Sequence, residues 1–431
     1  MKLYAKDLQN YLNKEVIFAG WVHSKRILGK IAFIILRDKT GFLQATFKKD
    51  ILKEKFHKVK HIQNESVVKV MGTIQEKVGG GYEILVKDFS IINESEPLPI
   101  EIWNPDIKTQ FIKRIQYRPL DLRRPETLTI FKIRNSVIQY FREYLLNKGF
   151  IESQTPKIVL MGAESGADVF KVDYFRKTAY LAQSPQLYKQ MLMASGIDQY
   201  FEFGWYWRAE KSHTSRHLTE FYGLDVEMAW INDHYDILDF VGDMLKYVLK
   251  RISKSNKESL DLLGLHIDIP KSIPRISLKE AYKILGQLGK KLKYGSDLDS
   301  ESERLLGKYF MEEYNEPIVF ITNYPWSERP FYHMRLEEDP FWTKSFDIFY
   351  KGLEISTGAQ REHRFEVLLK QAKEKNVPLE PLKYYLETFK YGMPPHGGFG
   401  LGIDRFVKQL LDLKDIREAV LWFRDPEHLS P

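Results

Sequence analysis

Cysteine is absent from this chain of 431 residues. A protein without thiols can form no disulfide, thiolate zinc site or iron–sulfur cluster, and it has no cysteine nucleophile. Long apolar runs are missing too, because the longest, Ile31–Leu36, has six residues, whereas a membrane-spanning helix needs about 20. The first residues also lack the apolar segment of a signal peptide. We therefore expect a cytoplasmic protein that has no membrane partner.

Two phosphate-binding signatures are absent as well. The sequence contains neither GxGxxG nor a Walker loop, which disfavours a dinucleotide-binding or P-loop fold. What is present is ample core material, since 43% of the residues are hydrophobic and 14% are aromatic. At roughly 100–200 residues per domain, the length predicts two to four domains.

The net charge of +7 is concentrated near the N-terminus. Residues 1–93 hold 17 Lys and Arg against 9 Asp and Glu, which leaves 48 basic and 49 acidic residues in the remainder. A basic domain beside a neutral one is typical of a polyanion-binding appendage. A lysine-rich surface that only aids solubility explains the charge equally well.

The first 93 residues predict five strands, with a lysine-rich helical stretch at 50–61 between the third and fourth. The strands expected are Val16–His23, Ala32–Arg37, Phe42–Phe47, Val67–Ile74 and Tyr82–Val86. This order matches the OB-fold, a small Greek-key barrel that binds oligonucleotides. Residues 94–122 contain several prolines and predict a hinge or linker.

From residue 123 to 431 the pattern predicts a second, α+β domain. A helix over 126–148 carries one apolar stripe, and further helices are expected near 233–254, 278–287, 301–314, 362–375 and 403–412. The strand-like runs are Ala179–Ala182, Tyr200–Trp207, Leu224–Trp230, Pro317–Ile321, Ser345–Phe349 and Leu353–Ser356. We expect an antiparallel sheet flanked by helices, with an insertion at about 255–325 to which the sequence assigns no role.

Three segments place charged residues in β-rich surroundings, where a charge is costly unless it has a partner. The first begins Arg208-Ala-Glu210 and runs through 225–227. The second extends from Asp347 to Arg361. The third, residues 394–405, is rich in glycine and ends in arginine. Arginines beside a glycine-rich junction suit a polyphosphate, and two carboxylates seven residues apart suit Mg²⁺. Each segment alone is weak, since such patterns are usually ion pairs or turns.

In this order the three segments resemble the three motifs of class II aminoacyl-tRNA synthetases. The string Gln183-Ser-Pro-Gln-Leu-Tyr-Lys-Gln190 is similar to the aspartyl-tRNA synthetase family of archaeal and eukaryotic type, and the likeness runs nearly end to end. The resemblance implies an OB-fold barrel joined to a class II catalytic domain. It also implies a homodimer formed through residues 126–156.

The resemblance implies that aspartate and ATP react to aspartyl-adenylate, from which aspartate passes to tRNA-Asp. Arg208 and Arg405 would be the catalytic residues, with Arg208 bridging the substrate carboxylate and the α-phosphate. Matching positions for ATP are Arg208, Glu210, His217, Phe221, Glu354, Gly402 and Arg405. Asp347 and Glu354 match the positions that hold Mg²⁺. Such chemistry needs positioning and charge neutralisation, so we expect no protein nucleophile.

The resemblance further implies an aspartate pocket in which Lys189 and Arg361 grip the side-chain carboxylate. Its other members are Glu164, Ser184, Gln186, Asp225 and Thr357. Asparagine would then leave the two cations buried and uncompensated, a mismatch that rejects the wrong substrate. A solvent-facing Lys189 is the structural alternative.

In the barrel, Phe33, Gln44 and Glu83 match the family's anticodon-binding positions. An aromatic side chain and an amide on a basic barrel suit single-stranded RNA, although Phe33 also fits a core position. His23 matches a position linked to tRNA choice in some relatives, which raises the hypothesis that tRNA-Asn is charged too. The alternatives are an asparaginyl-tRNA synthetase, an amide-forming paralogue without the barrel, and a non-catalytic tRNA-binding paralogue.

Overall fold

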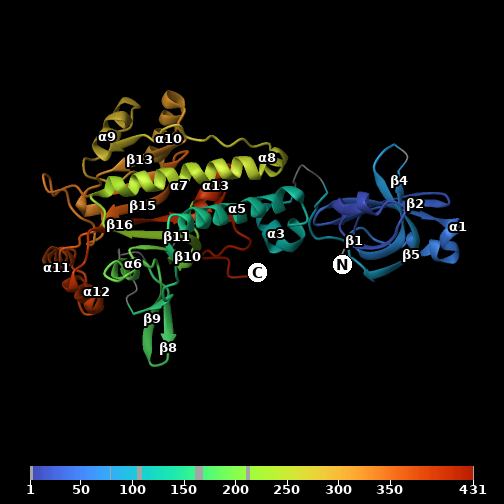
Figure 1. Ribbon diagram of the computed structural model, residues 1–431, viewed down its shortest axis with the longest axis horizontal. Coiled ribbons are helices and arrows are strands. Elements are labelled where there is room, and N and C mark those ends of the chain that lie inside the picture. The colour runs from blue at the N-terminus through green and yellow to red at the C-terminus, as the bar shows by residue number, and fades with distance from the viewer. Residues whose placement is uncertain (1–2, 78, 104–108, 161–167, 210–213, 431) are drawn as a thin grey trace. The chain divides into compact units, whose positions relative to one another are not determined.

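A computed structural model describes residues 3–77, 79–103, 109–160, 168–209 and 214–430 (Figure 1). The chain divides into two units, Met1–Glu101 and Ile102–Pro431. Within the described residues, no helix has the length and apolar character needed to cross a membrane.

The first unit is a closed five-stranded barrel in the order β1-β2-β3-β5-β4, which confirms the OB-fold. Its strands are β1 (Glu15–Leu28), β2 (Ile31–Asp38), β3 (Gly41–Lys48), β4 (Val67–Glu76) and β5 (Tyr82–Asn93). The short helices α1 (Lys49–Leu52) and α2 (Phe56–Val59) lie between β3 and β4 in the chain. In β2 the apolar residues at alternate positions are buried, so Phe33 lies on the outer side while Ile34 enters the core.

The second unit is built on an eight-stranded sheet in the order β12-β13-β14-β15-β16-β11-β10-β6. Only the pairs β12–β13 and β10–β6 are parallel, so the expected antiparallel α+β architecture is confirmed. The strands are β6 (Ile151–Glu152), β10 (Gln199–Trp207), β11 (Glu220–Ala229), β12 (Arg275–Ser277), β13 (Ile318–Thr322), β14 (Ser345–Tyr350), β15 (Leu353–Gln360) and β16 (His396–Gly402). A separate small sheet contains β7 (Ile158–Val159), β8 (Lys171–Tyr174) and β9 (Lys177–Leu181).

Two long helices, α5 (Pro125–Asn147) and α7 (His234–Ser255), lie side by side over the sheet (Figure 1). Their buried residues share one core with β10, β11, β14 and β16. The other helices are α3 (Phe111–Gln116), α4 (Arg118–Asp121), α6 (Gln186–Leu192), α8 (Lys257–Leu263), α9 (Leu278–Gln287), α10 (Ser300–Tyr314), α11 (Phe365–Glu374), α12 (Lys383–Thr388) and α13 (Ile403–Leu410). Pro125 occupies the first turn of α5 and Gly149 follows its end with φ of 88°, as the start and stop signals of a helix require.

The segment 94–122 is only partly a connector. Residues 94–101 belong to the first unit, whereas α3 and α4 belong to the second. There the buried guanidinium of Arg118 donates to the carbonyl oxygens of Val420 and Leu421 at 2.6 and 2.9 Å. A hinge therefore remains a prediction for the residues before α3.

The insertion at 255–325 is part of the architecture, because β12 and β13 extend the main sheet and α9 and α10 cover them. A side chain at Gly307 in α10 would place its Cβ 2.3 Å from the backbone nitrogen of Gly352, in the turn between β14 and β15. The helix thus lies directly against that turn.

The two helical glycines of the insertion should respond oppositely to alanine. Gly286→Ala removes backbone freedom in α9 and meets no atom within 4 Å, so it should stabilise the protein by about 0.5 kcal/mol. Gly307→Ala should destabilise it by roughly 1–3 kcal/mol because α10 must move away from the turn. Thermal denaturation of the two variants tests this, and equal shifts would contradict the close helix–turn contact.

Candidate active site

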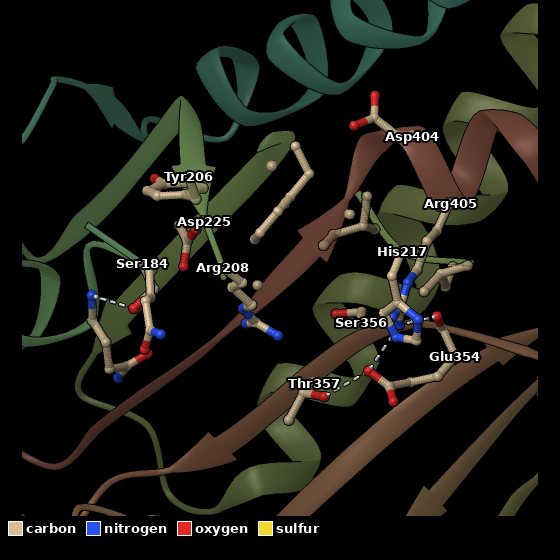
Figure 2. A pocket seen from close by; sticks show the side chains of 18 of the residues that line it. Ser184, Tyr206, Arg208, His217, Asp225, Glu354, Ser356, Thr357, Asp404 and Arg405 are labelled. Atoms are coloured by element: carbon tan, nitrogen blue, oxygen red, sulfur yellow. Dashed lines mark hydrogen bonds and ion pairs between the residues drawn. The ribbon is translucent and has the colours of Figure 1, made fainter. Parts of the chain in front are cut away.

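A cavity of about 470 Å³ lies over the central strands of the second unit (Figure 2). It brings together eleven of the positions expected to bind ATP or aspartate: Ser184, Gln186, Arg208, His217, Phe221, Asp225, Glu354, Thr357, Arg361, Gly402 and Arg405. Glu164 and Glu210 lie outside the described residues. Segments from β11, β15, β16 and the start of α6 therefore meet at one place.

The cavity has two chemically different ends, with Arg208 between them (Figure 2). Ser184 and Asp225 lie at one end, and His217, Glu354 and Arg405 lie at the other. The guanidinium of Arg208 lies 5.3 Å from the ring centre of Phe221, an arrangement that holds a cation over an aromatic face.

At the second end, Arg405 at the start of α13 connects two segments. Its Nη1 donates to the carbonyl oxygen of Glu354 at 3.0 Å, and its Nε donates to that of Arg216 at 3.3 Å. The carboxylate of Glu354 accepts from the hydroxyl of Thr357 at 3.2 Å. His217 is held by Thr214, whose hydroxyl lies 2.7 Å from Nδ1.

Beneath the first end lies a cluster of four buried charges, Lys189, Asp225, Glu227 and Arg361. Lys189 is fully buried, so the solvent-facing alternative is wrong. Its Nζ lies 3.0 Å from Asp225 and 3.2 Å from Glu227. Arg361 binds Glu227 through Nε and Nη2 at 2.9 and 3.2 Å.

The electrostatics of this cluster correct one expectation. Burial alone would raise the pKa of Glu227, but the charges of Arg361 and Lys189 outweigh it and lower that pKa. Burial raises the pKa of Asp225 despite Lys189. Asparagine would therefore not leave the two cations uncompensated, because both already have carboxylate partners. Lys189 also does not line the cavity, whereas Arg361 and Asp225 do.

Arg361 has a further partner that the sequence did not indicate. Its Nη1 lies 3.2 Å from Nε2 of His333, which forms an isolated β-bridge with it. Burial and the charge of Arg361 hold the pKa of His333 well below its usual value. The neutral ring therefore accepts through Nε2 and carries its proton on Nδ1. Nothing in the local sequence around 333 signals this contact, since it depends on strand pairing.

Of the two residues expected to hold Mg²⁺, one lines the cavity and the other lies in the protein interior. Glu354 lines the cavity, while Asp347 is buried and bonded to Nη2 of Arg329 at 2.6 Å. Burial raises the pKa of Asp347 to about 7. Its Oδ1 is buried and has no partner in the described part of the chain. A hard cation prefers carboxylate oxygens, but the described residues form no cluster of three or more candidate ligands, so a Mg²⁺ site at Asp347 and Glu354 stays a prediction.

The glycines of β16 serve two purposes. A Cβ on Gly398 would lie 2.0 Å from the carbonyl oxygen of Val226 and 2.3 Å from Oε2 of Glu227. Gly397 is similarly confined by Ala359. Gly398 thus allows close packing on the charged cluster and Gly397 on β15, and among the glycines of β16 only Gly400 and Gly402 face the cavity.

On the barrel, Phe33, Gln44 and Glu83 lie on neighbouring strands. Phe33 pairs with Arg26 of β1 and Thr46 of β3, and Gln44 pairs with Glu83 of β5. The buried Glu83 accepts from Nε2 of Gln44 at 2.6 Å. That bond orients the amide and leaves its oxygen as an acceptor.

His23 lies at an irregularity of β1, between Val22 and Ser24. Its ring meets Phe42 edge-on at 4.8 Å. Burial and the charge of Arg37 lower the pKa of His23, so the imidazole is neutral at physiological pH.

Comparisons with known proteins agree with this geometry. The family model for class II tRNA synthetases (D, K and N) matches residues 111–425, and the model for the OB-fold nucleic acid binding domain matches residues 16–92. The aspartate–tRNA(Asp) ligase of Thermococcus kodakarensis is 43% identical over 99% of both chains. The aspartate–tRNA(Asp/Asn) ligase of Aeropyrum pernix is 43% identical over 98% of this chain and 97% of its own.

Two solved structures are also similar throughout. The asparaginyl-tRNA synthetase of Pyrococcus horikoshii, complexed with asparaginyl-adenylate, has a TM-score of 0.92 at 33% identity, with complete coverage of both chains. A putative aspartyl-tRNA synthetase from Leishmania major has a TM-score of 0.92 at 32% identity, covering all of this chain and 94% of its own.

The antiparallel sheet, the three charged segments and the barrel define a class II aminoacyl-tRNA synthetase. Within that class, the full-length identities assign the chain to the aspartate–tRNA ligase family.

Removing Lys189 should cost stability as well as activity. Lys189→Met leaves Asp225 without its cation and Glu227 with one cation fewer, so the free energy of unfolding should fall by about 3–5 kcal/mol. Adding Asp225→Asn should restore part of the loss. The matched control is Lys257→Met, whose partner Asp261 is exposed, and its effect should stay below about 0.5 kcal/mol. Urea denaturation measures all three, and a neutral Lys189→Met would contradict the charged cluster.

Proposed function

We propose that the two ends of the cavity hold aspartate and ATP, and that Arg208 joins them. The observation that carries this proposal is the location of Arg208 between the Ser184–Asp225 end and the His217–Arg405 end (Figure 2). A planar, permanently charged guanidinium can bind the aspartate α-carboxylate and the α-phosphate of ATP together. Holding the attacking oxygen beside phosphorus favours formation of aspartyl-adenylate with release of diphosphate.

Selection of aspartate rests on hydrogen-bond donors around Arg361. Three of its five N–H groups are directed to Glu227 and His333, which leaves two for a ligand in the described structure. Gln186 also lines the cavity, and its Nε2 is buried without a partner among the described residues. A carboxylate accepts from all of these donors, whereas the NH₂ of asparagine would face them as another donor. Lys189 contributes by holding Asp225 and Glu227.

At the other end, Phe221 and Arg405 would enclose the adenine, and Glu210 would accept from its amino group. His217 and Arg405 would bind the outer phosphates. Asp347 and Glu354 would hold Mg²⁺, which neutralises phosphate charge when bound. Thr357 supports Glu354 through its hydroxyl. No protein base is required, because positioning and charge stabilisation account for the reaction.

An ATP–diphosphate exchange assay tests the proposal. Aspartate should drive exchange at least about 100-fold better than asparagine, as kcat/KM, because the pocket offers donors to the side chain. Gln186→Leu should raise KM for aspartate about tenfold, which is the loss of one hydrogen bond to a charged group. KM for ATP should change less than about twofold, since the variant leaves the phosphate end intact.

Gln186→Leu is a suitable probe, because Nε2 has no partner among the described residues and its loss leaves none of their acceptors without a donor. Exchange driven by asparagine alone would assign the chain to the asparaginyl alternative. No exchange with either amino acid would favour the non-catalytic paralogue. Equal increases in KM for aspartate and KM for ATP would show that Gln186 does not act specifically on aspartate.

For the second step, we propose that the barrel binds the anticodon of tRNA-Asp. Phe33 lies opposite Arg26, which provides a stacking surface beside a cation. The amide oxygen of Gln44, oriented by Glu83, can accept a hydrogen bond from a base. His23 supports the further hypothesis that tRNA-Asn is also a substrate, and the Aeropyrum pernix relative is named for both tRNAs.

Charging of the two purified transcripts tests both parts. If both tRNAs are substrates, their kcat/KM values should agree within about 100-fold, and a preference on the order of several hundredfold for tRNA-Asp would reject tRNA-Asn. Phe33→Ala should raise KM for tRNA roughly tenfold through loss of a stacked base. Aspartate-dependent exchange, which needs no tRNA, should be unchanged.

We also propose that the enzyme works as a homodimer through residues 126–156, in the cytoplasm. Support comes from apolar side chains that are about half exposed at Leu146 and Ile151, since such surfaces commonly mark interfaces. A monomer mass in sedimentation equilibrium would rule the dimer out.

A further inference from the structure

Helix α10 of the insertion reaches the phosphate end of the cavity. The guanidinium of Arg216, which lines the cavity, donates through Nη1 to the hydroxyl of Ser300 and through Nη2 to the carboxylate of Glu303. Ser300 and Glu303 lie in the first turn of α10, more than 80 residues further along the chain. The insertion thus contacts a side chain of the cavity wall.

Glu303 is not an ordinary surface glutamate. Its side chain is only 9% exposed, and burial raises its pKa while the charge of Arg216 opposes that shift. The backbone of Glu354 also opposes this rise in pKa. A buried carboxylate is costly unless a partner compensates it, and here the partner is Arg216, which lines the cavity.

The location of Glu303 is fixed by backbone packing. Besides the contact of Gly307 with Gly352, a Cβ on Gly352 would lie 3.1 Å from both the Cα of Arg304 and the carbonyl oxygen of Glu303. The first two turns of α10 therefore rest directly on the turn that precedes β15. Glu354 lies two residues after Gly352. The turn that supports α10 therefore also positions Glu354.

These contacts connect four residues from four segments. Arg405 contacts the carbonyl oxygens of Arg216 and Glu354, Glu303 pairs with the side chain of Arg216, and the backbone of Glu303 packs on Gly352, two residues before Glu354. Within the described residues, Nε of Arg216 is buried and has no partner. With one N–H of each terminal nitrogen directed to α10, three of the five N–H groups of Arg216 remain for an anion, and the buried Nε–H is one of them.

We propose that Glu303 is a positioning residue for ATP, which acts by holding Arg216 against the phosphate end of the cavity. The insertion is then part of the nucleotide-binding apparatus. The proposal rests on the assignment of this end to the phosphates under the proposed function. Because Glu303 offsets the charge of Arg216, the pair supplies an oriented donor more than a net positive charge.

Steady-state exchange kinetics of Glu303→Ala and Glu303→Gln test this role. Glu303→Ala should raise KM for ATP roughly tenfold, and Glu303→Gln, which keeps an acceptor, should raise it less. KM for aspartate should stay within about twofold for both variants, because the aspartate end is separate. In an Arg216→Ala background, Glu303→Ala should add little, since its route to ATP is already lost.

Glu301→Ala is the matched control, because Glu301 lies in the same turn but pairs with Lys290 at the surface. It should leave both KM values unchanged. If Glu303 only weakened ATP binding by its charge, both Glu303 variants would lower KM for ATP, and the proposal would be wrong. A lower melting temperature with unchanged KM values would make Glu303 merely structural. Absence of aspartate-dependent exchange in the unmodified protein would instead overturn the proposed function.

Discussion

The rest of the site depends on the ion pairs that the buried carboxylate of Glu227 forms with two cations. This carboxylate lies between Lys189 and Arg361 and gives two interior cations a common partner. Without it, Arg361, which directly follows β15, would bring a cation into the core with no carboxylate partner, and Lys189 of α6 would keep only Asp225. The ion pairs within this cluster offset the free-energy cost of burying its charges. Arg361 is thereby held rigid while two of its N–H groups remain for a ligand.

At the opposite end of the cavity, cations are likewise held in place by hydrogen-bond acceptors from other segments. There Arg405 and Arg216 are fixed by backbone carbonyls and by acids from distant segments. Both ends therefore use cations whose orientation is set before any ligand arrives, as electrostatic preorganisation requires. The central sheet makes this possible, because β11, β15 and β16 are adjacent and carry residues for both ends.

Local sequence patterns predicted most of the fold. Alternating apolar residues located the start of every barrel strand within one residue, although β1 and β5 extend five and seven residues beyond their expected ends. Helix α9 was expected at 278–287, as observed. Strand β16 was not among the expected strands, because glycine has no β-propensity of its own. It forms a strand between β15 and β11, where close packing leaves little room for side chains. The site was predictable where residues follow a family pattern, as at Arg208 and Arg361. Contacts such as Arg216 with Glu303 and Arg361 with His333 depend on tertiary pairing, which no local pattern encodes.

The close fit of Gly398 against Glu227 constrains how such an enzyme can evolve. Each interior cation is paired with a carboxylate, and β16 packs on this cluster too closely for a side chain. Replacing one charged residue alone would therefore leave its partner buried without a counter-charge. Replacement of one of these charged residues is therefore expected to need a second substitution that rescues the stability lost to the first. Strong epistasis at these positions is the evolutionary consequence of a charge-balanced interior.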